Sequence, residues 1–236
     1  MAGPQHIVSA YSEELESLSA DILRMGGLAE AMIRDASRAV VTRDAQLAEL
    51  VIERDHEMDQ LETEVERQAV RMLALRQPMA ADLRNVIGAI KLAGGIERIG
   101  DLAKNIARRS LAVVDEDNRE ALKGIERMGQ AVSRMLQVAL DAYARRDPVT
   151  AIGVLKQDDD IDSRYNALLR SMLGYMAEAP EQMSARSNFL FIVKNLERIG
   201  DHCTNIAKVV HFIATGEQIG DTTPSAPASN TKEAQS

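Results

Sequence analysis

The sequence predicts an all-α protein: two tandem, internally duplicated three-helix bundles, six long antiparallel helices in all, and a disordered C-terminal tail. Apolar residues recur at helical spacing along nearly the whole chain, and no segment alternates as a β-strand would. Aromatic residues make up only 3% of the chain and Trp is absent, although 45% of its residues are apolar. The core must therefore consist mainly of Leu, Ile, Val, Ala and Met, which favours the packing of helix on helix.

Six helices are expected between about residue 10 and residue 216. The clearest start is Asp147 followed by Pro148, because Asp caps free amide groups and Pro is tolerated at the first helical position. The first bundle is expected to span residues 1–115, the second residues 116–216, and the polar tail residues 217–236. The breaks lie near Arg43–Asp44, Gln77–Pro78, Val114–Asp117, Asp147–Pro148 and Pro180.

The chain contains an internal repeat of one three-helix unit. Residues 97–107 match residues 197–207 at eight of eleven positions, an offset of 100. The matches include Glu, Gly, Asp and Asn in register, which two unrelated amphipathic helices would not share. Three further segments recur at an offset of 103: Met25-Gly26 as Met128-Gly129, Arg43-Asp44 as Arg146-Asp147, and Asp55 with Asp59 as Asp158 with Asp162.

Two pairs of carboxylates are expected at the same height on adjacent helices of each unit. Glu97 and Asp101 are four residues apart and share one face of their helix, as do Asp55 and Asp59 on the preceding helix. Both pairs are equally far from the turn at Pro78, so an unbroken antiparallel hairpin places them side by side. The spacing does not fix whether they face each other. The second unit repeats the pattern with Asp158, Asp162, Glu197 and Asp201.

These eight acids are predicted to bind metal ions. Gathered carboxylates repel one another unless one is protonated or a cation lies among them. Oxygen ligands alone favour hard cations such as Mg, Ca, Mn or iron, and suit structural zinc less well. The alternative is a solvated acidic face. It is weakened because Leu190 and Val193 lead by helical spacing into Glu197, so that the acids continue an apolar stripe.

Gly100 and Gly200 lie between the paired acids, inside their helices. A glycine there costs roughly 1 kcal/mol relative to alanine, so its presence in both copies predicts the close approach of a neighbouring helix or a ligand. The asparagines one turn further along could be outer ligands or bridge helix backbones. The adjacent arginines could neutralise the acids or be solvated. The residues that could form this outer shell are Asn105, Asn205, Arg98 and Arg198.

Charge and end sequences limit the classes of function. The formal charge is −8, from 28 Lys and Arg against 36 Asp and Glu, which disfavours nucleic-acid binding. The single cysteine, Cys203, cannot form an internal disulfide, which indicates a reducing compartment. No signal peptide or membrane span is recognisable. A cytoplasmic protein is expected, with peripheral association at the inner membrane through protein partners left open.

His202 and Cys203 are not expected to form a soft-metal site. Their counterparts in the first unit are Leu102 and Ala103. Cys203 is therefore predicted to be a core residue, while a role for His202 stays open.

The sequence resembles the PhoU family of phosphate-transport accessory proteins. The resemblance rests on the repeated Glu-Arg-Ile-Gly-Asp and Asn-Ile-Ala segments, the preceding Asp pairs and the duplication. The likeness covers about Tyr11 to Gly216. It implies two tandem three-helix bundles and metal ions or clusters at Glu/Asp-x-x-x-Asp motifs, here Glu97/Asp101 and Glu197/Asp201. The metal is expected to be iron, Mn, Mg or Zn. One departure is that Ser163-Arg164 replaces Gln60-Leu61, so the surroundings of the two sites are expected to differ.

The same resemblance implies a non-enzymatic regulatory adaptor. It would link the ATPase subunit of an ABC phosphate transporter to a membrane sensor histidine kinase. Its effect would be to repress the phosphate-starvation response and restrain phosphate import. The resemblance also implies a homodimer.

Two other functions are considered. A carboxylate-bridged di-metal enzyme or iron-handling bundle needs Glu-x-x-His pairs, but Gly100 and Gly200 stand three residues after the glutamates. A purely structural helical scaffold would leave the acids solvated. Neither a nucleotide-binding glycine loop nor a convincing nucleophile with its base is present in the sequence.

Overall fold

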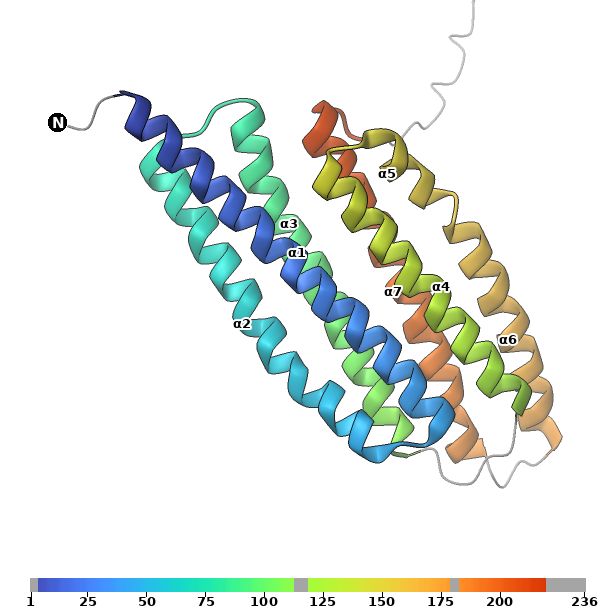
Figure 1. The fold of residues 1–236 in the computed structure, drawn as a ribbon. Helices are drawn as coiled ribbons and strands as arrows, with labels where there is room; N and C mark the ends of the chain where they lie inside the picture. Colours follow the sequence, from blue (N-terminus) through green and yellow to red (C-terminus); the bar gives the residue numbers. More distant parts are fainter. Residues whose placement is uncertain (1–3, 113–118, 179–182, 220–236) are drawn as a thin grey trace, which may run out of the picture.

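The structure, a computed structural model, describes residues 4–112, 119–178 and 183–219. Every regular element in these ranges is a helix, and Figure 1 shows the helices of each unit lying alongside one another. The predicted all-α bundle architecture is confirmed. The expected boundary at 115–116, the break at Pro180 and the tail beyond 219 lie outside the described residues. The helices are α1 Pro4–Thr42, α2 Ala45–Arg76, α3 Ala81–Ser110, α4 Arg119–Arg145, α5 Pro148–Leu155, α6 Asp158–Glu178 and α7 Met183–Thr215.

The expected fifth helix is divided into α5 and α6. The backbone amide of Gln157 bonds to the carbonyl of Val154 at 3.0 Å, which tightens the chain into a turn. α6 then opens on three consecutive acids, Asp158 to Asp160. Because carboxylates are stabilised by the positive end of a helix dipole, this run favours a new helix N-terminus here. One acid pair of the second unit therefore lies at a helix start, whereas its counterpart lies within the unbroken α2.

The first turn of each unit repeats in detail. Arg43 and Arg146 have positive φ values of 55° and 52°, and each ends its helix. The next residue caps the following helix: Asp44 accepts from the amide of Leu47 at 3.0 Å. Asp147 accepts from two amides, at 3.0 and 3.1 Å, and a hydrogen bond from the Thr150 hydroxyl helps to lower its pKa. The predicted start at Asp147–Pro148 is confirmed.

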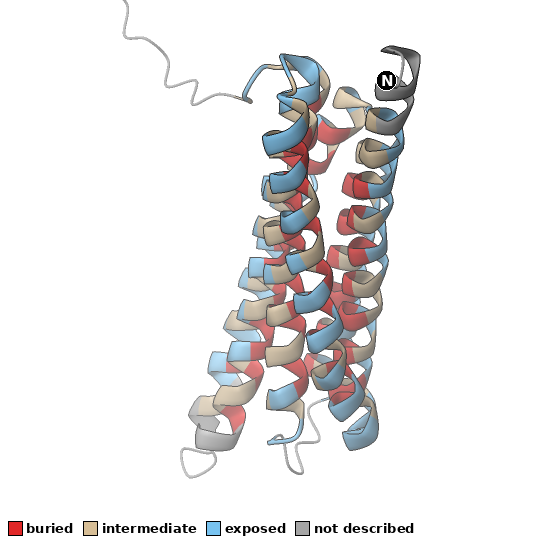
Figure 2. Cartoon of the chain, turned by 90° about the vertical axis from the view of Figure 1, so that its left-hand side faces the viewer, coloured by how far each residue is buried: buried red, intermediate tan, exposed pale blue. Residues whose placement is uncertain are grey.

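The two units share one continuous hydrophobic core. The most extensive contact between helices joins α3 to α7, the last helix of each unit. Buried residues line the inward faces of the helices, while the outward faces are exposed (Figure 2). No helix in the described part of the chain is long and apolar enough to cross a membrane.

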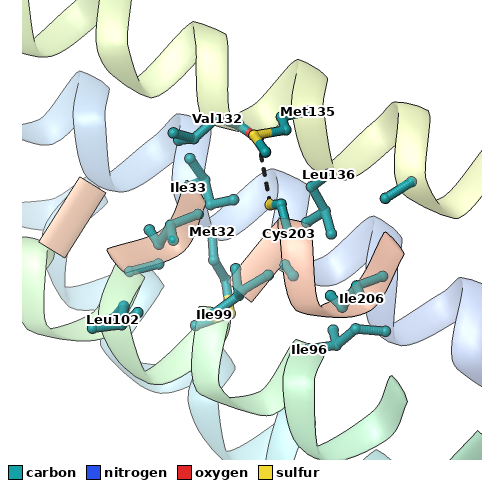
Figure 3. Close-up of a cluster of buried hydrophobic side chains, with 14 of the residues drawn as sticks. Met32, Ile33, Ile96, Ile99, Leu102, Val132, Met135, Leu136, Cys203 and Ile206 are labelled. Carbon is teal, nitrogen blue, oxygen red and sulfur yellow. Dashed lines mark hydrogen bonds between the residues drawn. The ribbon is translucent and has the colours of Figure 1, made fainter. Parts of the chain in front are cut away.

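Cys203 lies in the middle of this core, as predicted. Its side chain is fully buried among Met32 and Ile33 of α1, Ile99 of α3 and Met135 of α4 (Figure 3). The thiol lies 3.9 Å from a backbone carbonyl oxygen on α4, and burial raises its pKa. An inaccessible neutral thiol of this kind is a packing residue.

Candidate functional site

The acid pairs of the first unit face each other across α2 and α3, with a lysine between them. Lys104 Nζ lies 2.5 Å from Asp55 Oδ2 on α2 and 2.5 Å from Asp101 Oδ1 on its own helix. Asp55 is buried, and a buried carboxylate normally requires a partner such as this lysine. Burial alone would lower the pKa of Lys104, but hydrogen bonds to Asp101 and Asp55 outweigh it and the pKa is raised. The lysine therefore remains a cation between two carboxylates.

The remaining acids of this site are less well compensated. Burial, and then the charges of Asp101 and Glu62, raise the pKa of Glu97. Arg98 offers only long ion pairs, 3.6 Å to Glu97 and 3.7 Å to Asp101. The first acidic cluster therefore has five members, Asp55, Asp59, Glu62, Glu97 and Asp101.

Glu62 was missed by the sequence reasoning. Its pKa is raised by burial and then by neighbouring acids, including Asp59 and Asp101. Glu62 stands three residues after Asp59, so it continues the same helical face, and it points toward Gly94, where an added Cβ would lie 3.6 Å from its Oε1. Helical spacing from Asp55 and Asp59 was the signal that could have found it.

The second acidic cluster comprises Asp158 and Asp162 of α6 with Glu197 and Asp201 of α7. Burial is the largest cause of the raised pKa of Asp158, followed by the charges of Asp162 and Asp201. The acids of α6 and α7 are therefore close enough to repel one another. The division of the fifth expected helix has not separated them.

Among the described residues, no lysine lies between the acids of the second cluster in the way that Lys104 does in the first. Thr204 occupies the position of Lys104 and donates its hydroxyl to the backbone carbonyl of Asp201 at 2.7 Å. Lys194, whose side chain is half-exposed, instead bonds Glu197 Oε1 at 2.6 Å. The other oxygen, Glu197 Oε2, is buried and has no hydrogen-bond partner in the part of the chain that the structure describes. A buried carboxylate oxygen without a partner is energetically costly. The second cluster thus lacks a cation at the position where the first one has Lys104.

Both predicted close approaches at glycine are confirmed. A Cβ added at Gly100 would lie 3.2 Å from Met58 Cγ of α2. One added at Gly200 would lie 3.1 Å from Ile161 Cγ2 and 3.4 Å from Asp158 Oδ1 of α6. Met58 and Ile161 are equivalent in the repeat, so the glycines hold each helix pair together directly beside its acids.

The outer residues are placed less closely. Arg98 and Arg198 are exposed, Asn105 is half-buried and Asn205 is exposed. Burial, and then Arg198, lower the pKa of His202, which favours a neutral imidazole.

The carboxylate oxygens of the two clusters are chemically suited to a hard cation. The positions of their side chains are less well suited to one. Within the described residues, no group of three or more His, Cys, Asp or Glu side chains is gathered so as to hold a metal ion. In the first cluster, Lys104 already occupies the space between two acids. In the second, Lys194 bonds one oxygen of Glu197, and the other oxygen has no hydrogen-bond partner among the described residues. A cation therefore fits the second cluster better.

Comparison with known proteins matches both units. The family model described as PhoU domain matches residues 22–110 and 125–210. The phosphate-specific transport system accessory protein PhoU homolog of Caulobacter vibrioides (strain NA1000 / CB15N) is 46% identical over 221 residues, covering 93% of this chain and 96% of that protein.

Two solved structures have the same fold. The crystal structure of PhoU from Pseudomonas aeruginosa matches with a TM-score of 0.84 and 38% identity, covering 88% of this chain and 100% of that one. The phosphate transport system regulatory protein PhoU from Streptococcus pneumoniae matches with a TM-score of 0.82 and 30% identity, covering 89% and 99%. Fold, duplication and sequence agree, and the chain belongs to the PhoU family.

Proposed function

We propose that this protein is a regulatory adaptor of phosphate uptake. The observation that carries the proposal is the 46% identity, over 93% of the chain, to a protein named as an accessory of the phosphate-specific transport system. The adaptor links the ATPase subunit of an ABC phosphate transporter to a membrane sensor histidine kinase. It represses the phosphate-starvation response when phosphate is plentiful and restrains import. It acts in the cytoplasm, at the membrane through these partners, as a homodimer and without catalysing a reaction.

A deletion strain tests this function. With phosphate in excess, loss of the gene should derepress a phosphate-starvation reporter, and a plasmid copy of the wild-type gene should restore repression. Tagged protein should also co-purify with the transporter ATPase or the kinase, whereas an unrelated tagged helical protein should not. Normal repression in the deletion strain, with neither partner recovered, would overturn the proposal.

A carboxylate-bound metal ion is the second part of the proposal. Iron, Mn, Mg or Zn would be held by Asp158, Asp162, Glu197 and Asp201, once their side chains turn toward one another. The ion would supply positive charge to acids that now repel one another, and would tie α6 to α7. At the first cluster it would compete with Lys104. Binding to the folded chain alone would also stabilise the fold by mass action.

Elemental analysis of protein purified without chelators tests the metal site. The Asp158→Ala/Asp201→Ala variant should lose bound metal, whereas the matched variant Asp55→Ala/Asp101→Ala should retain the metal of the second cluster. Wild-type protein without metal, also after incubation with each of the four ions, would overturn this part. The adaptor function would stand independently of that result.

A further inference from the structure

A basic groove lies between the C-terminal half of α1 and the middle of α4, the pair of helices side by side in Figure 1. Its volume is about 400 Å³. Arg34 and Arg38 line it from α1, and Arg134 lines it from α4, while Glu126 is the one acid in its lining. Three guanidinium groups against one carboxylate form a local positive site on a chain whose formal charge is −8.

The arginines of the groove are largely unpaired. Arg34 lies 3.7 Å from Asp35, a long contact at the side of the groove, and Asp35 itself forms a 2.5 Å ion pair with Arg54. In the described part of the chain, neither Arg38 nor Arg134 forms an ion pair. Guanidinium groups bind carboxylates and phosphates through paired N–H donors, so unpaired arginines converging on a groove are suited to an oxyanion.

The wall of the groove contains a buried hydroxyl without a partner. Ser37 is 5% exposed, and its Oγ forms no hydrogen bond with any described residue. A serine within a helix usually bonds to its own backbone or to water, so an unsatisfied buried hydroxyl requires an explanation. Ser37 packs against Gly129 of α4, where any side chain would collide with it. Because Gly129 has no side chain, there is room for the Ser37 hydroxyl at the base of the groove.

The duplication provides an internal comparison for this contact. Ser37 and Leu140 are equivalent positions, as are Gly129 and Gly26, each pair being 103 residues apart. In the equivalent contact, Gly26 packs against Leu140, which is buried and apolar. Close packing of α1 on α4 therefore needs only a glycine and an apolar partner. The serine in the basic groove is not required by the fold.

The charges on the two sides of the α1–α4 pair differ in the same way. At the positions equivalent to the three arginines and Ser133, the other side of the α1–α4 pair has no basic residue. Burial, and then the charge of Asp141, raise the pKa of Glu30 there. The repeat therefore does not generate the basic character. The equivalent positions are Gln137 for Arg34, Asp141 for Arg38, Ala31 for Arg134 and Glu30 for Ser133.

We propose that this groove binds a phosphate group, with Arg34, Arg38 and Arg134 pairing its oxygens and the Ser37 hydroxyl donating a hydrogen bond to it. The site lies on α1 and α4, and its lining includes no member of either acidic cluster. It goes beyond the adaptor function and does not depend on it, because the groove is argued from its own residues. Free inorganic phosphate and a phosphorylated metabolite share this chemistry, and the volume of the groove admits either.

Isothermal titration of the full chain at constant ionic strength tests the site. Inorganic phosphate and ATP are titrated separately, in the presence of EDTA so that bound metal cannot contribute. Binding of inorganic phosphate supports a site for the free anion, and binding of ATP alone supports a site for a phosphorylated metabolite. Absence of binding by both at millimolar concentration would overturn the proposal.

Variants assign the binding to the groove. Arg38→Gln/Arg134→Gln should weaken it at least tenfold, whereas Arg108→Gln, which removes an exposed arginine of α3 outside the groove, should not change it. Ser37→Ala should weaken binding severalfold without lowering the melting temperature, because it removes an unsatisfied hydroxyl. Far-UV circular dichroism checks that the variants fold. Unchanged affinity in the folded double variant would overturn the assignment.

Discussion

The two acidic clusters have the same backbone and differ in how their charge is compensated. In both, a glycine brings two helices together and carboxylates face each other across them. The first cluster carries its own cation, Lys104, between two acids. The second has Thr204 at that position and leaves a buried oxygen of Glu197 without a partner. Duplication thus kept the geometry while the charge balance diverged, and one cluster depends more on an external cation than the other.

Exchanging the residue that distinguishes the clusters should have the largest effect. Thr204→Lys places an ammonium group among the acids of the second cluster. We expect its metal affinity to fall on the order of a hundredfold, about 2.7 kcal/mol. The reverse change, Lys104→Thr, should create metal affinity in the first cluster.

Calorimetric titration with Mn²⁺ measures both exchanges, and far-UV circular dichroism checks the fold. The comparison would be wrong if Thr204→Lys bound Mn²⁺ as tightly as the wild-type protein.

Removing the equivalent acid from each cluster should change stability in opposite directions. Asp55→Asn takes a buried carboxylate away from Lys104 and should lower the free energy of unfolding by about 2 kcal/mol. Asp158→Asn removes a charge that burial and neighbouring acids disfavour by more than the N-terminus of α6 stabilises it. It should raise that free energy by roughly a few tenths of a kcal/mol in metal-free protein.

Urea denaturation in EDTA measures both changes, with Glu53→Gln as an exposed-acid control on α2 that should be neutral. Destabilisation of similar size in the two units would show that their compensation does not differ.

The smallest expected effect is a pH dependence of the metal-free protein. Glu97 is harder to ionise when folded than when unfolded, since its pKa is raised from 4.5. Below 4.5 it is protonated in both states and costs nothing, while above its folded pKa it is charged in both and lowers stability by the full difference. Its destabilising contribution therefore diminishes as the pH falls from neutral toward 4.5.

Glu97→Gln should remove this contribution. The difference in melting temperature between variant and wild type should change by about 1 °C between pH 7.5 and pH 5. The control is Glu53→Gln, which removes an exposed acid of α2 outside the cluster. A difference for Glu97→Gln that is equally independent of pH would argue against the crowding of acids around Glu97.

Backbone features of this molecule followed readily from the sequence. Helical rise is constant, so the distances of the acid pairs from Pro78 were enough to place them side by side. The recurring Gly100 and Gly200 predicted the close helix contacts, and Asp147 predicted a helix start. Each of these depends on local chemistry or on a regular repeat.

Features that depend on long side chains or on contacts between units were not predicted. Lys104 is three residues from Asp101, but its spacing alone does not show that it reaches across to Asp55. The turn after Leu155 was not predicted, because apolar periodicity continues through it. The run of acids beginning at Asp158 was nevertheless a signal for a new helix start. The groove arginines converge only because α1 packs on α4, a contact that repeat arithmetic does not describe.

The α1–α4 contact also bears on the history of the chain. Gly26 against Leu140 and Gly129 against Ser37 are related by an approximate two-fold axis, as in an isologous interface between identical subunits. In a true homodimer of one three-helix unit, any change at such a position would appear on both sides at once. Joining the copies in a single polypeptide removes that constraint. A serine could then arise opposite one glycine while a leucine remained opposite the other, giving an asymmetric protein from a symmetric ancestor.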